Sequence, residues 1–232
     1  MTKKLLLSIA PVLALAMFAV MPALAQAQTR AYGTCEAGTH TSECPAGETK
    51  FKAFANGKAV KVVSKKAAGS GNFILEVEAT GEKIECTTFK NKGTVENKAG
   101  IGHSTLTLEF DDCTLVTGIG KGCSVQTPKA PKPDEIIGKV TDEVLASGTE
   151  VKITVTSGFE LETDGEPATC PLPAGTPLGT VKGTATGTQA AGSNVLVFTK
   201  AKGLFLGTEA SNITGSDELE TEATPKKKVV IN

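Results

Sequence analysis

The clearest alternation of apolar and polar residues in this chain is Ser104-Thr105-Leu106-Thr107-Leu108-Glu109-Phe110. Successive side chains of a β-strand point to opposite sides, so Leu106, Leu108 and Phe110 share one face, which we expect to point inward. The pattern predicts a strand with one buried face and one solvated face. We expect a turn at Asp111-Asp112, which would lead the chain into Cys113.

Similar alternations lie on both sides of this stretch, separated by Gly, Asn, Asp or Pro. We predict strands at 72–78, 83–89, 150–156, 159–162, 179–188, 194–199, 204–206 and 217–224, with turns at Thr80-Gly81 and Ser157-Gly158. Residues 134–146 fit either a strand or a turn of helix, and the Pro-rich residues 127–133 predict an exposed connection. The sequence therefore predicts an all-β fold, an antiparallel β-sandwich or barrel-like domain.

The N-terminus has the features of a cleavable secretory signal. Lys3 and Lys4 precede an apolar run at 5–20, and Ala23-Leu24-Ala25 offers a cleavage site after residue 25, with a second possible after residue 27. We expect a signal peptide at 1–25, an N-terminal disulfide-stapled segment at 26–48 and an all-β domain at 49–232. No second long apolar run follows, so the prediction is a secreted, extracellular protein without membrane insertion after cleavage.

All six cysteines follow the predicted signal, which favours disulfides over metal or redox chemistry. Six cysteines allow about 15 pairings, and sequence alone does not select one. Proximity along the chain favours Cys35–Cys44, and the two neighbouring strands favour Cys86–Cys113, which leaves Cys123 and Cys170. Their spacings do not match the closely spaced cysteine pairs of zinc modules.

These residues carry a resemblance. The early cysteine loop, the strand ending Lys83-Ile84-Glu85-Cys86, the stretch from Leu106 to Cys113 and the pair Cys123-Ser124 resemble a group of uncharacterised secreted, cysteine-containing, β-rich bacterial proteins. The resemblance covers residues 35–170. It implies a secreted β-rich fold and no known activity.

The sequence contains few residues arranged in patterns that indicate catalysis or ligand binding. The predicted mature chain has about three more acidic than basic residues, which disfavours nucleic acid as a partner. Of the two histidines, His40 and His103, neither lies in a catalytic signature, although Gly102-His103-Ser104 is a conspicuous cluster. Oxygen ligands for calcium are conceivable at three acidic pairs, but turn aspartates explain them better: Asp111 with Asp112, Asp164 with Glu166, and Asp217 with Glu218.

We therefore expect a non-catalytic, secreted β-scaffold that is surface-associated, adhesive or matrix-interacting, with an extracellular protein or surface as partner. The sequence predicts no catalytic, cofactor-binding or metal-binding residue and no cofactor. Two alternatives stay open: a secreted hydrolase that uses acidic residues, and a module that binds calcium or a small ligand.

Overall fold

The computed structural model describes residues 30–36, 44, 50–190 and 192–231, so the predicted signal at 1–25 lies outside the described residues. The described residues contain strands and no helix, and consequently no helix long and apolar enough to cross a membrane. The strands are β1 (Tyr32–Glu36), β2 (Lys50–Ala53), β3 (Val60–Lys66), β4 (Phe73–Val77), β5 (Lys83–Lys98), β6 (Ile101–Leu115), β7 (Val125–Gln126), β8 (Ile136–Val144), β9 (Glu150–Thr163), β10 (Pro177–Gln189), β11 (Val195–Leu206), β12 (Glu209–Thr221) and β13 (Val229–Ile231).

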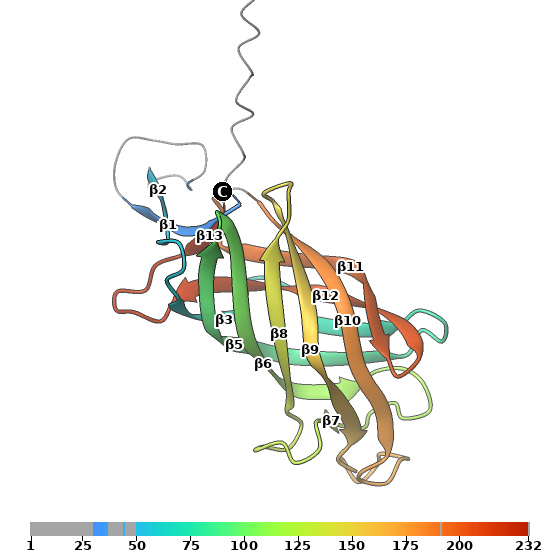
Figure 1. The fold of residues 1–232 in the computed structure, drawn as a ribbon. Helices are drawn as coiled ribbons and strands as arrows, with labels where there is room; N and C mark the ends of the chain where they lie inside the picture. The colour runs from blue at the N-terminus through green and yellow to red at the C-terminus, as the bar shows by residue number, and fades with distance from the viewer. Residues whose placement is uncertain (1–29, 37–43, 45–49, 191, 232) are drawn as a thin grey trace, which may run out of the picture.

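The main sheet closes on itself (Figure 1). Strands β5, β6, β8, β9, β10, β11 and β12 pair antiparallel in that order, and β12 returns to β5 through β3 and β4. Since β3 and β4 pair with successive parts of β5 and β12, they act as one broken strand. The barrel-like alternative of the sequence prediction is therefore confirmed, and the order around the closed sheet follows the order along the chain.

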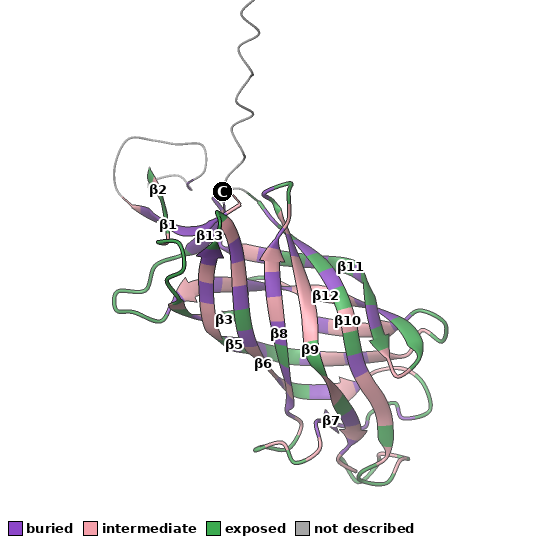
Figure 2. Cartoon of the chain, in the orientation of Figure 1, coloured by how far each residue is buried: buried purple, intermediate pink, exposed green. Residues whose placement is uncertain are grey.

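Alternating side chains fill the interior of this closed sheet. Figure 2 shows buried and less buried residues alternating along the strands, as expected for one inner and one outer face. The rings of Phe73, Phe89 and Phe110 meet inside, with centroids 4.4 to 5.4 Å apart. The face predicted for 104–110 is thus the inner face, although Leu108 is only partly buried.

The pairing of the strands decides three local predictions made from the sequence. The predicted turn at Asp111-Asp112 is wrong, because β6 runs through it in unbroken register with β5. The predicted turn at Ser157-Gly158 is also wrong: β9 continues there, and its register with β10 shifts between Phe159 and Val155. Gly158 has φ = +64°, so an irregularity inside a strand accounts for the turn-like residues. The ambiguous segment 134–146 contains the strand β8.

All three predicted disulfides are present in the structure. Cys35 bonds to Cys44, Cys86 to Cys113 and Cys123 to Cys170. Cys86 and Cys113 are direct cross-strand neighbours on β5 and β6, as their predicted places on adjacent strands require. Three disulfides indicate that the chain folds in an oxidising compartment.

A second, three-stranded sheet covers one end of the closed sheet. In it β1 pairs with β13 and β2, which joins the two ends of the described chain (Figure 1). Asn97, at the end of β5, accepts a hydrogen bond from the Tyr32 backbone N–H at 2.8 Å and donates to the backbone carbonyls of Tyr32 and Phe54, each at 2.9 Å. The Tyr32 ring lies against Gly102, where any added Cβ would come within 2.7 Å of it. This end of the closed sheet is therefore covered by β1 and by the ring of Tyr32.

We predict that Asn97→Ala lowers the free energy of unfolding by about 2 kcal/mol, because it leaves buried backbone groups of β1 without partners. Urea unfolding followed by tyrosine fluorescence measures this directly, since Tyr32 is the one tyrosine of the chain and there is no tryptophan. Asn56→Ala, at an exposed neighbouring position, is the matched control and should change stability by less than about 0.5 kcal/mol. Equal stability of the two variants would show that Asn97 does not hold β1.

Candidate ligand chamber

The interior of the closed sheet contains an apolar cavity of about 100 Å³, which we call the chamber. Aliphatic and aromatic side chains from the strands line most of it, among them Phe73, Leu106, Val140, Ala185, Phe198 and Leu204. A closed sheet of this size holds either tightly packed side chains or one small ligand. An apolar cavity of about 150 Å³ is known to stay dry and to bind benzene, so the chamber, which is smaller, by itself has room for only part of such a molecule or for a smaller apolar group.

A second cavity, the mouth, lies at the end of the closed sheet opposite to Tyr32. It has a volume of about 240 Å³, and its lining includes Leu115, Gly120 and Leu172. Leu75 and Ile84 line both the chamber and the mouth, so the two cavities adjoin. Ile119, on the rim, is 83% exposed.

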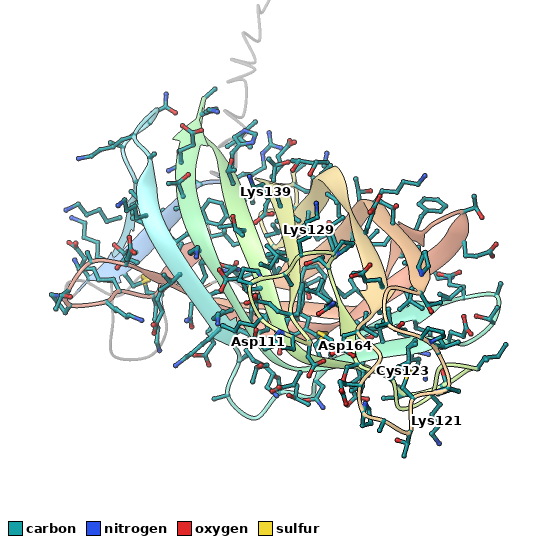
Figure 3. The ribbon with its side chains drawn as sticks, turned by 90° about the horizontal axis from the view of Figure 1, so that it is seen from below. Asp111, Lys121, Cys123, Lys129, Lys139 and Asp164 are labelled. Carbon is teal, nitrogen blue, oxygen red and sulfur yellow. A yellow bond between two sulfur atoms is a disulfide. The ribbon has the colours of Figure 1, made fainter. Side chains whose placement is uncertain are left out.

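Loops tied together by a disulfide surround the mouth. The Cys123–Cys170 bond links the loop after β6 to the loop between β9 and β10. Figure 3 labels Cys123 and Lys121, both on the loop after β6, in a view from below. The hydrogen bond from the Ser124 backbone N–H to the Glu166 carbonyl, at 2.8 Å, adds a second link between them. The sequence thus stabilises the rim covalently.

The end of the chamber nearest β1 is polar. Ser104 Oγ on β6 donates to Asp142 Oδ2 on β8 at 2.6 Å, across the strand pair that places these two residues opposite each other. Asn91 Nδ2 on β5 donates to Asp217 Oδ2 on β12 at 3.5 Å. Asp142, Asp217, Asn91 and Tyr32 all line the chamber, and we call these four residues the polar end.

Burial dominates the electrostatics of the polar end. Asp142 is 5% exposed and Asp217 is 6% exposed. Burial raises the pKa of Asp142 to about 6, against the hydrogen bond from Ser104 that lowers it. Burial likewise raises the pKa of Asp217 to about 7, against an interaction with Ser64 that lowers it, and the negative charge of Asp142 adds to the rise. Burial, followed by the charges of both aspartates, raises the pKa of Tyr32 well above its usual value, so its hydroxyl keeps its proton.

The polar end has unused hydrogen-bond acceptors. Within the described part of the chain, Asp142 Oδ1 and Asn91 Oδ1 are buried and have no hydrogen-bond partner. The described residues that line the chamber include two carboxylates and no lysine, arginine or histidine. A buried carboxylate without a cationic partner is costly, and native proteins normally satisfy such groups. The arrangement suits a group that brings hydrogen-bond donors or positive charge.

Neither histidine was predicted to be catalytic, and His103 does not line this chamber. His40 lies outside the described residues. His103 is on the outer face of β6, between its cross-strand neighbours Glu96 and Glu143. Its neighbour Ser104 points inward to Asp142, so the cluster Gly102-His103-Ser104 places its histidine and serine on opposite faces.

The three acidic pairs considered for calcium are engaged elsewhere. Asp111 forms an ion pair with Lys90 at 3.2 Å, and Asp164 Oδ1 accepts from the Glu166 backbone N–H at 2.8 Å. Asp217 belongs to the polar end, whereas Glu218 accepts from the backbone N–H of Ala68 at 3.1 Å. Across residues 30–36, 44, 50–190 and 192–231, no group of three or more His, Cys, Asp or Glu side chains is arranged to hold a metal ion.

One further acidic contact lies near the mouth loops. Burial, with a hydrogen bond to Asp164 as the next cause, raises the pKa of Asp134 to about 6. Two carboxyl groups that approach closely do not both ionise readily, so Asp134 holds its proton to higher pH than an isolated aspartate does.

Sequence reasoning missed the polar end as a site. Asp217 was considered only as a calcium ligand, and Tyr32, Asn91 and Asp142 were not singled out. A usable signal was present: in β8, Asp142 alternates with Val140 and Val144, all three of which are buried. A charged residue on the apolar face of a strand is the kind of exception that marks a buried polar site.

Comparison of the chain with protein-family models, with curated proteins and with solved structures found no match.

Proposed function

We propose that this protein is a secreted, non-catalytic binding module that holds one small, largely apolar molecule inside its closed sheet. The observation that carries this proposal is the apolar chamber adjoining a mouth of about 240 Å³. Ligand sites in proteins are typically concave, mostly apolar and provided with a few placed polar groups. The chamber, the mouth and the polar end have this composition.

The same geometry does not support a hydrolase of the serine–histidine type. The serine nearest to a buried carboxylate, Ser104, donates directly to Asp142. Nucleophilic hydrolysis requires a base that takes the proton of the nucleophile, normally a histidine oriented by a third group. His103, on the opposite face of β6, is not in position for that role.

The surface-adhesive role expected from the sequence stays a prediction. One route to adhesion is the addition of a partner strand to an exposed sheet edge, and closure removes such edges from a sheet. Pairing of β10 with both β9 and β11 removes the edges of the main sheet, although the three-stranded sheet keeps β2 and β13 as its edge strands. We therefore place the small-ligand alternative ahead of adhesion.

A variant that fills the chamber tests the proposal. Ala185 is buried and lines the chamber, so Ala185→Leu should occupy the space and abolish binding of benzene, used as an apolar probe. Methyl shifts in NMR spectra report benzene binding, and thermal unfolding checks that each variant folds. Thr186→Leu places the same side chain at the adjacent exposed position and should leave benzene binding unchanged. Failure of benzene to bind the parent chain, or unchanged binding by folded Ala185→Leu, would refute the proposed function.

A further inference from the structure

We propose that the chamber selects an apolar molecule that carries a protonated amine, with the ammonium group at the polar end and the hydrocarbon part directed toward the mouth. This inference rests on the proposed function and names the chemical class of its ligand. Two features of the described residues carry it: the unpartnered acceptors Asp142 Oδ1 and Asn91 Oδ1, and the absence of a basic side chain from the chamber lining.

The acceptors are positioned for donors of a ligand. Ser104 occupies one oxygen of Asp142, and Asn91 contacts one oxygen of Asp217. An ammonium group has three N–H donors and no acceptor, which matches a site that offers free oxygens. It also supplies the positive charge that two buried carboxylates otherwise lack.

Other ligand classes fit less well. A carboxylate ligand such as a fatty acid would add a third negative charge beside Asp142 and Asp217 and would be repelled. A calcium ion takes about six to eight oxygen ligands, more than two carboxylates and one amide supply, and it would leave the apolar wall unused. An alkylammonium ion uses both the polar end and the apolar wall.

The chamber runs between two ends of opposite character. The polar end includes Tyr32, the first residue of β1, whereas Leu75 and Ile84 form the boundary with the mouth. A ligand with one charged end and one apolar end therefore has a single favoured orientation. Head groups that do not offer donors are left facing unpaired acceptors, which costs free energy.

The test compares two probes of equal chain length, hexan-1-amine and hexan-1-ol, with the full mature chain at pH 8. We expect the amine to bind at least tenfold more tightly, measured by isothermal titration calorimetry and by the fluorescence of Tyr32 in the polar end. In the Asp142→Asn/Asp217→Asn variant, binding of the amine should fall to the level of the alcohol, while binding of the alcohol changes little. Asp112→Asn, at an exposed position outside the chamber, should behave as the parent chain does.

The pH dependence provides a second readout. Facing Asp142 across the chamber are the ionisable groups of Asp217 and Tyr32, and the tyrosine stays neutral. Since the aspartates take up protons as the pH falls from 8 to 5, the preference for the amine should shrink over this range while the alcohol is unaffected.

Each outcome separates this inference from the proposed function. Equal affinity for amine and alcohol would overturn the inference, and so would a preference for the amine that survives in the double variant. Either result would leave the proposed function, binding of an apolar molecule in the chamber, intact. A rise in melting temperature with calcium but not with the amine would also overturn it. Failure of benzene, amine and alcohol alike to bind would overturn both proposals.

Discussion

The Asp142→Asn/Asp217→Asn variant should be more stable than the parent chain at pH 8, by about 2 kcal/mol or more. Both aspartates are ionised at this pH in a buried setting that raises their pKa values to about 6 and about 7. A neutral amide of the same shape avoids the cost of burying that charge. For a chain of this length the gain corresponds to about 4 to 8 °C in melting temperature.

The sign of the pH effect follows from proton linkage. A carboxyl whose pKa is higher in the folded state binds more protons there than in the unfolded state. The parent chain should therefore gain stability as the pH falls from 8 toward 5, and each unit by which a pKa is raised is worth about 1.4 kcal/mol at full effect. Glu109, whose pKa is lowered by Lys92, acts in the opposite direction, but only near and below its usual titration range.

Urea unfolding of both chains at pH 8 and pH 5 provides the measurement, and the gap between them should be smaller at pH 5. Asp112→Asn is the matched control, because it removes an exposed carboxylate. A double variant that is less stable than the parent at pH 8 would show that the aspartates serve the fold. Stabilisation would show that they are kept at the expense of stability, as expected for functional groups.

The second large effect concerns the disulfide that borders the mouth. Replacing Cys123 and Cys170 together by alanine should lower the free energy of unfolding by about 4 kcal/mol, according to the chain-entropy model of cross-linking. The bond spans a sequence separation of 47, against 27 for Cys86–Cys113 and 9 for Cys35–Cys44. Because the cost grows with loop length, the three double-alanine variants should lose stability in that order, the last by about 3 kcal/mol.

Denaturant unfolding of the three variants tests this order. Each variant lacks one disulfide, so the three serve as controls for one another. If removal of Cys35–Cys44 cost the most, loop length would not govern their contributions. Loss of Cys123–Cys170 should in addition weaken binding of benzene, since the bond links two loops that flank the mouth. Loss of Cys35–Cys44 should leave benzene binding unchanged.

The strands were predictable where local alternation was strong. The structure has strands at the predicted residues 72–78, 104–110 and 150–156. Alternation of apolar and polar residues with a period of two is typical of a half-buried strand and does not fit a helix. Turn residues inside long strands were misleading. Asp111-Asp112 and Ser157-Gly158 look like turns locally, but pairing with β5 and β10 carries the chain through them.

The sequence by itself determined the all-β class and the alternation of inner and outer faces, since these depend on residues close in the chain, and it favoured the disulfide pairing without selecting it. Only the tertiary structure decided that the sheet closes, that β1 pairs with β13 and that Asp142 and Asp217 meet Tyr32 in one chamber. These features join residues up to about 200 positions apart. Local periodicity carries no information about which distant strands pair, because backbone hydrogen bonds are the same for every partner.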